Sequence, residues 1–216
     1  GKVTDMLVKE AQAFGKISTG NSKMPGTTFA MDSFACITGS KLRKIEGTPC
    51  YSCYAIKIQK LRPSVDKGWK ANSAKWAAAK PEEWTQAMAF QIKRYNTDDH
   101  HRWFDGGDLA SVEQLVAIVN VAHMTPTIKH WLPTQERGMV KQYLANGGTF
   151  PSNLVVRISA AKVDTALKGH TNTSNVITKH AEPTGQECMA YTRGNNCGDC
   201  RACWSPEVSN VSYRKH

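Results

Sequence analysis

The sequence has no run of apolar residues that approaches the roughly 18 needed to cross a bilayer. Its opening stretch, GKVTDMLVKEAQ, lacks the charged-then-apolar order of a secretion signal. The G-x-S-x-G, P-loop and Rossmann glycine patterns are missing too, which argues against a serine hydrolase, an NTPase and a dinucleotide-binding enzyme. We therefore expect a cytoplasmic protein that makes no contact with a membrane.

Cysteine is absent from residues 54–187, and histidine is absent from residues 1–99. The seven cysteines consequently form two groups: Cys36, Cys50 and Cys53, and then Cys188, Cys197, Cys200 and Cys203. Seven is many for a cytosolic chain of this length. Without a secretion signal, clustered cysteines indicate metal or redox chemistry rather than a disulfide framework.

The N-terminal group has the spacing C-x13-C-x2-C and no histidine nearby to complete a zinc site. Three thiolates on a [4Fe–4S] cluster leave one iron open to a substrate or small molecule, so these cysteines are candidate cluster ligands. Two alternatives remain open. Cys36 could be a core cysteine beside a Cys50–Cys53 redox dithiol, or the two groups could share a single site.

The C-terminal group has the spacing C-x8-C-x2-C-x2-C in a turn rich in glycine and asparagine. Zinc sites usually take two separated C-x2-C pairs, whereas successive C-x2-C spacings resemble the ligation of a [4Fe–4S] cluster. We therefore expect iron–sulfur chemistry here, with zinc as the alternative. The two groups together predict one or two clusters.

The middle of the chain alternates between β-branched runs and amphipathic segments with short connections. This order predicts right-handed βαβ units and a parallel sheet, hence an α/β fold with a partial (β/α) barrel. We expect that domain over residues 1–180, with a cysteine-rich loop at 36–53, followed by a cysteine-rich, metal-binding extension at 181–216. The predicted strands are 101–108, 127–134, 153–160 and 174–180, and the predicted helices include 81–95, 111–124 and 136–148.

Functional residues of parallel βα folds collect at the carboxyl ends of the strands. The first predicted strand ends in Asp105-Gly106-Gly107-Asp108, where Asp105 and Asp108 are candidate catalytic carboxylates or, alternatively, acids that cap a turn. Arg157 on the third predicted strand is a candidate clamp for a carboxylate or phosphate, although an ordinary salt bridge explains it equally well.

Acidic residues are few compared with basic ones, which leaves a net charge of +10 and a pI near 9.3. An anionic partner such as a nucleic acid is therefore one expectation. The basic residues are dispersed apart from a cluster at Lys41, Arg43 and Lys44, and dispersed charge can serve solubility alone. The sequence predicts neither the substrate nor the oligomeric state.

Three cysteines ending in C-x2-C, a following βα series and Gly-Gly-Asp at a strand end resemble the radical S-adenosylmethionine (SAM) enzymes. The resemblance implies that Cys36, Cys50 and Cys53 hold a [4Fe–4S] cluster whose open iron binds SAM. It implies that Gly106, Gly107 and Asp108 contact the SAM amino group, and that the C-terminal cysteines hold an auxiliary cluster. The x13 gap departs from the usual x3 spacing of that superfamily.

The chain also resembles the bacteriophage "gene product 88"-like family. The shared features are Cys53-Tyr54-Ala55, the strand end from Arg102 to Asp108, Pro126 to Trp131, and Asn196 to Trp204. The two resemblances imply an iron–sulfur protein of the host-cell cytoplasm, acting as a radical-SAM-like enzyme on an unknown substrate. The alternative is a non-catalytic or redox-sensing metalloprotein, with iron–sulfur or zinc, that binds nucleic acid or a host protein.

Overall fold

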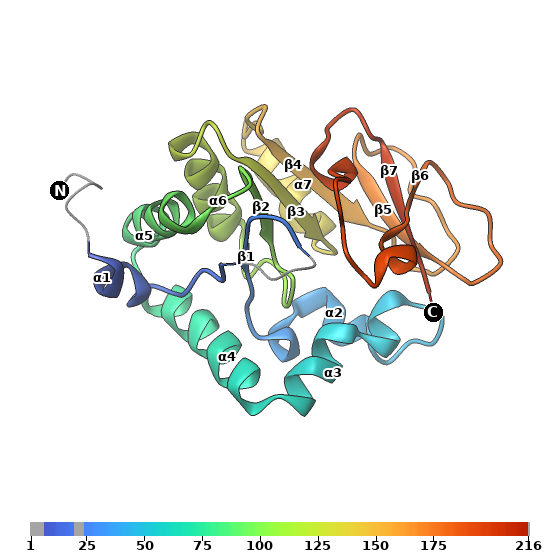
Figure 1. Cartoon of the computed structure of the whole chain (residues 1–216), viewed down its shortest axis with the longest axis horizontal. Helices are drawn as coiled ribbons and strands as arrows, with labels where there is room; N and C mark the ends of the chain where they lie inside the picture. The colour runs from blue at the N-terminus through green and yellow to red at the C-terminus, as the bar shows by residue number, and fades with distance from the viewer. Residues whose placement is uncertain (1–6, 20–23, 216) are drawn as a thin grey trace.

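One seven-stranded, entirely parallel sheet organises the chain in a computed structural model that describes residues 7–19 and 24–215. The sheet curves into a half-barrel with the order β1-β2-β3-β4-β5-β7-β6 (Figure 1). The strands are β1 (Thr27–Phe29), β2 (His100–Trp103), β3 (Lys129–Thr134), β4 (Leu154–Ser159), β5 (Thr173–Ile177), β6 (Gln186–Cys188) and β7 (Asn210–Arg214).

α-Helices lie in the connections from β1 to β4, as is usual for parallel strands, whereas the later strands are joined by loops and short 3-10 turns. The α-helices are α1 (Val8–Gln12), α2 (Ile37–Leu42), α3 (Tyr54–Leu61), α4 (Pro63–Ala78), α5 (Pro81–Tyr95), α6 (Val112–Met124) and α7 (Arg137–Ala145). Short 3-10 turns are η2 (Ser33–Ala35), η3 (Pro49–Ser52), η4 (Ala190–Arg193) and η5 (Ala202–Trp204). Local sequence explains several boundaries: Pro81 occupies the first turn of α5, and the Ser111 hydroxyl accepts a hydrogen bond from the Gln114 amide at the start of α6.

Alternation along the strands gives the sheet two different faces. Trp103, Leu132 and Val156 point to the convex side, where they form one buried cluster with α5 and α6. Arg102 and Trp131 are register partners on β2 and β3 that point to the concave side and line a cavity. The convex face therefore carries the hydrophobic core, and the concave face is free to carry a site.

The α/β fold with a partial-barrel parallel sheet is confirmed, and each predicted middle strand overlaps an observed one within a few residues. The sequence missed β1, β6 and β7. Strands β6 and β7 belong to the same sheet, with β7 between β5 and β6, so residues 181–216 build part of the half-barrel itself. Within the described residues, no helix is both long and apolar enough to span a membrane.

Two histidines are buried under α5 and α6 in neutral form. The Nδ1 atom of His130 accepts a hydrogen bond from the Trp103 indole at 3.1 Å, and its Nε2 lies 2.7 Å from the Thr125 hydroxyl. Burial lowers the pKa of His130 to about 3 and also lowers the pKa of His101. In the unfolded chain these two histidines bind protons below a pKa of roughly 6.5, whereas in the folded protein they do not.

Stability should accordingly fall as the pH drops below about 6.5. Between pH 7 and pH 5, His130 alone is expected to remove about 2 kcal/mol from the free energy of unfolding. Urea titrations at both pH values check this when wild type is compared with His130→Asn, because the comparison cancels the other titrating groups. An equal pH-dependent loss in both proteins would contradict the prediction.

Candidate functional site

A cavity of about 520 Å³ occupies the concave side of the half-barrel. Thr28 of β1, Arg102 of β2 and Trp131 of β3 form one wall, and Tyr213 of β7 lies on another. A second hollow of about 580 Å³ lies at the amino ends of β2 to β4 and contains no cysteine in its lining. Catalytic groups of parallel folds gather at the carboxyl ends of strands, so the concave cavity is the better candidate site.

The three N-terminal cysteines come together in the loop between β1 and α3. Cys36 precedes α2, Cys50 lies in η3 and Cys53 begins α3. A side chain at Gly39 would place its Cβ 3.8 Å from the Sγ atoms of both Cys36 and Cys50. The same Cβ would lie 3.0 Å from the Cβ of Cys36, so glycine allows the chain to approach Cys36 closely at this position.

Two of these thiols, those of Cys36 and Cys50, have a raised pKa. Burial, followed by the nearby charges of Asp108, Cys53 and Cys50, raises the pKa of Cys36 well above its usual range. Burial together with Cys53 and Asp108 raises the pKa of Cys50 to about 11. A bound cationic centre would supply the charge that ionises them.

The glycine-rich end of β2 lies against this cysteine loop. The Met31 amide donates to the Gly106 carbonyl at 3.0 Å, and the Gly107 amide donates to the Ser33 hydroxyl at 3.1 Å. Asp108 is close enough to Cys36 and Cys50 to affect the pKa of both thiols. The fold thus brings together the predicted cluster ligands and the predicted Gly-Gly-Asp motif.

The two aspartates of this motif have different surroundings. Asp108 accepts hydrogen bonds from the Thr134 hydroxyl at 2.6 Å and the Gln135 amide at 2.9 Å, and burial raises its pKa to about 6. Asp105 lines the cavity, burial raises its pKa, and its Oδ1 atom has no hydrogen-bond partner. Of the two, Asp105 is the carboxyl group that has a buried oxygen without a hydrogen-bond partner.

The C-terminal cysteines face the same cavity from the opposite strands. The cavity is lined by Cys188 of β6, by Cys197, and by Cys203 of η5, whereas Cys200 is exposed. Nearby Cys188 raises the pKa of Cys197 and of Cys203, after the larger effect of burial, and the pKa of Cys203 reaches about 11. Pro49 and Tyr54, which flank the N-terminal cysteines, also line the cavity, although Cys36, Cys50 and Cys53 are not among its lining residues.

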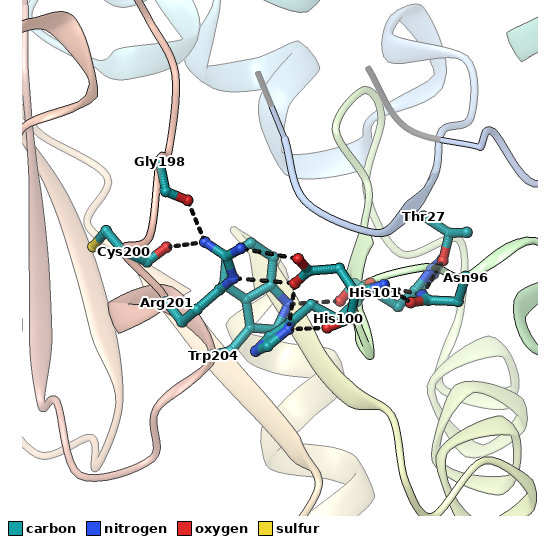
Figure 2. A network of polar contacts seen from close by, with 9 residues as sticks. Thr27, Asn96, His100, His101, Gly198, Cys200, Arg201 and Trp204 are labelled. Carbon is teal, nitrogen blue, oxygen red and sulfur yellow. Dashed lines mark hydrogen bonds and ion pairs between the residues drawn. The ribbon is translucent and has the colours of Figure 1, made fainter. Parts of the chain in front are cut away.

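The C-terminal cysteine segment is tied to the start of β2 (Figure 2). Arg201 forms an ion pair with Asp98 at 3.0 Å and donates to the carbonyls of Gly198 and Cys200. Trp204 donates through its indole N–H to the His101 carbonyl at 2.9 Å. These contacts hold the turn that carries the cysteines against the sheet.

Arg157 holds the same segment from β4. Its buried guanidinium donates to six backbone carbonyls, those of Thr173, Ala202, Cys203, Ser205, Val208 and Ser209, at 2.7–3.4 Å. All three of its nitrogens are engaged in these contacts. Arg157 therefore positions the cysteine segment, and its donors are not available to a carboxylate or phosphate ligand.

All seven cysteines are free thiols. Within residues 7–19 and 24–215, no three Cys, His, Asp or Glu side chains form a group that could hold a single metal ion. The cysteines of a [4Fe–4S] cluster bind different irons, so their sulfurs need not converge on one point. The sulfur-only donor sets fit a cluster in their chemistry.

Sequence reasoning missed Arg102, Trp131 and Gln135 as site residues. All three line the cavity, and each has a buried side-chain atom without a hydrogen-bond partner. Arg102 lies over the Trp131 ring at 4.6 Å. Strand alternation could have placed Arg102 and Trp131 on the same face, but their pairing depends on the β2–β3 register.

One known protein family matches most of the chain. The profile of the family described as gene product 88, a bacteriophage family, matches residues 31–206. This range contains the cysteine loop, the Gly-Gly-Asp strand end and all four C-terminal cysteines. The comparisons with curated proteins and with solved structures each gave no match. The chain therefore belongs to the gene product 88 family.

Proposed function

We propose that this protein is an iron–sulfur enzyme of the radical-SAM type whose substrate occupies the concave cavity. One observation carries the proposal: the Cys36, Cys50 and Cys53 loop after β1 packs against Gly106-Gly107-Asp108 at the end of β2. Both segments lie at the carboxyl edge of a parallel half-barrel, where such folds place their chemistry.

Within this proposal, each residue has a definite task. Cys36, Cys50 and Cys53 hold a [4Fe–4S] cluster that, when bound, supplies an electron to SAM. The Gly106–Asp108 turn shapes the edge beside it, and Asp105 lines the cavity with one buried carboxylate oxygen that has no hydrogen-bond partner. Cys188, Cys197, Cys200 and Cys203 hold a second centre across the cavity, where Arg102 is close enough to lower the pKa of Cys197 and Cys203.

A second candidate is a non-catalytic or redox-sensing metalloprotein with a single four-cysteine centre that binds nucleic acid or a host protein. The charge distribution favours it: residues 34–62 contain six basic residues and one acidic residue, which is half of the net charge of +10. In this case the C-terminal centre, with iron–sulfur or zinc, stabilises the fold, and the basic segment contacts the partner.

Anaerobic purification with iron and sulfide analysis separates the two candidates. The enzyme should contain about eight irons per chain, absorb near roughly 400 nm and change its spectrum when SAM is added. The triple variant Cys36→Ala/Cys50→Ala/Cys53→Ala should retain about four irons and lose the SAM response. The matched variant Cys188→Ala/Cys197→Ala/Cys200→Ala/Cys203→Ala should also retain about four irons but keep the response. Zinc without sulfide in the wild-type protein would contradict the proposal.

A further inference from the structure

One polar contact joins a C-terminal cysteine to a side chain outside the cysteine group. The Sγ atom of Cys203 lies 2.9 Å from the hydroxyl oxygen of Tyr213, which is within hydrogen-bond distance. Both residues line the concave cavity, whose lining also includes Cys188 and Cys197. Tyr213 therefore directs its one polar side-chain atom at a predicted metal ligand.

The sheet fixes Tyr213 from both sides. Strand β7 lies between β5 and β6 (Figure 1), and Tyr213 is paired in register with Val176 of β5 and Cys188 of β6. All three residues line the same cavity, so their side chains point to the same face of the sheet. A side chain on a strand that is paired along both edges is positioned more precisely than one on a loop. The tyrosine ring therefore stands beside Cys188 and reaches Cys203 with its hydroxyl.

Other contacts fix Cys203. Its carbonyl accepts a hydrogen bond from Arg157 Nε at 3.0 Å, and the neighbouring Trp204 donates through its indole N–H to the His101 carbonyl at 2.9 Å. These bonds hold η5 to β4 and β2 without using the sulfur. The bond between the hydroxyl and the sulfur is thus a small part of what holds either segment, which points to an effect on the sulfur itself.

The direction of this hydrogen bond follows from the chemistry of its two partners. A metal-bound cysteine is a thiolate, which has no proton to donate. A phenol keeps its proton below a pKa of roughly 10, so Tyr213 is the donor at neutral pH. Hydrogen bonds to the sulfurs are among the factors that set the reduction potential of an iron–sulfur cluster. Because reduction adds negative charge and a donor stabilises negative charge, the bond favours the reduced state.

We propose that Tyr213 is a positioning residue of the C-terminal centre, whose hydroxyl donates to the metal-bound Sγ of Cys203 and raises the reduction potential of that centre. Reduction takes one electron from an external low-potential donor, and the hydroxyl proton stays on the tyrosine oxygen. The inference rests on one part of the proposed function, an iron–sulfur cluster on the C-terminal cysteines, and not on the SAM chemistry.

Potentiometric titration of the full chain with dithionite, followed by electron paramagnetic resonance, tests the effect. The titration is made in the wild-type protein and in the N-terminal triple-alanine variant, which isolates the C-terminal centre. Tyr213→Phe should make reduction less favourable by about tenfold, which corresponds to a potential about 59 mV more negative. The control Tyr143→Phe removes a hydroxyl that donates to the Thr149 carbonyl beside the convex core, and it should leave the potential unchanged.

A second substitution keeps the test decisive when Tyr213→Phe disturbs the fold. A ring-fluorinated tyrosine in place of Tyr213 keeps the ring and the hydroxyl but makes the hydroxyl a more acidic, stronger donor. The potential should therefore become more positive. Opposite shifts with the two substitutions support the inference, because a loss of packing does not reverse its sign. A potential that either substitution leaves unchanged in folded, iron-loaded protein would overturn it.

Failure of the inference and failure of the proposed function are distinguishable. Iron and sulfide in the triple-alanine variant, with an unchanged potential after Tyr213→Phe, overturn the inference alone. A triple-alanine variant without iron and sulfide shows that the C-terminal cysteines hold no cluster, which overturns that part of the proposed function and the inference with it. The expected shifts in a protein that does not respond to SAM support the inference and overturn the radical-SAM assignment.

Discussion

Replacing Arg157 with methionine is expected to lower the free energy of unfolding by on the order of 3–5 kcal/mol. Methionine fills a similar volume but donates no hydrogen bond, so six backbone carbonyls would lose a partner. Most of these carbonyls belong to residues 202–209, which carry Cys203 and lead into β7. We expect this segment to detach locally, before the rest of the sheet unfolds.

Arg157→Lys is the matched control, because lysine keeps the charge and some donors but lacks the planar guanidinium that reaches six carbonyls. It should unfold at an intermediate urea concentration. Limited proteolysis should cut the methionine variant within residues 198–209 at denaturant concentrations that leave the wild-type protein intact. A methionine variant with the wild-type urea midpoint and the wild-type cleavage pattern would show that Arg157 does not hold the segment.

Gly107→Ala is expected to separate the cysteine loop from the end of β2. Gly107 has a φ angle of +78°, and a Cβ there would lie 2.8 Å from the Met31 carbonyl oxygen. Both the strained backbone and the clash with main-chain atoms oppose alanine, for a cost of about 2–4 kcal/mol. Because Met31 leads into the Cys36 loop, the variant should also lose iron from the N-terminal centre.

Gly138→Ala provides the control for this substitution. Gly138 lies in α7, and a Cβ there would meet nothing within 4 Å, so alanine should stabilise the helix by about 0.5–1 kcal/mol. Thermal melting and iron analysis of both variants give the comparison. Normal iron content and an unchanged melting temperature in Gly107→Ala would contradict the expected role of this glycine.

The helices and strands in the middle of the chain could be predicted because local residue patterns mark where they begin and what type they are. Ser111 and Pro81 mark helix starts, and the β-branched run at 153–160 marks a strand that the structure places at Leu154–Ser159. Strands β1 and β6 are only three residues long, and β7 is recognisable only through its pairing with β5 and β6. Such strands are stabilised by pairing with strands that are distant in the sequence. Hydrophobic periodicity and residue propensities, which are local signals, do not reveal this pairing.

Only part of the candidate site could be predicted from the sequence. The cysteines and the Gly-Gly-Asp motif were identified from residue type and spacing, and the fold brings the N-terminal set beside that motif. Arg157 was a candidate clamp for a carboxylate or phosphate, with an ordinary salt bridge as the equal alternative, and its donors are instead committed to backbone carbonyls of a segment about fifty residues away. Arg102 was not singled out as a site residue, because a lone arginine in a strand has no distinctive spacing and its contact with the Trp131 ring is visible only in three dimensions.

The strand order also determines when the site can assemble during synthesis. Strand β6, which carries Cys188, joins the sheet only through β7, and β7 follows it in the chain by some twenty residues. While the nascent chain is still in the ribosome, Cys188 has no sheet to join and stays accessible to solvent until residues 210–214 emerge. Cys188 therefore reaches its place in the sheet only after synthesis of β7, whereas the Cys36, Cys50 and Cys53 loop can form much earlier.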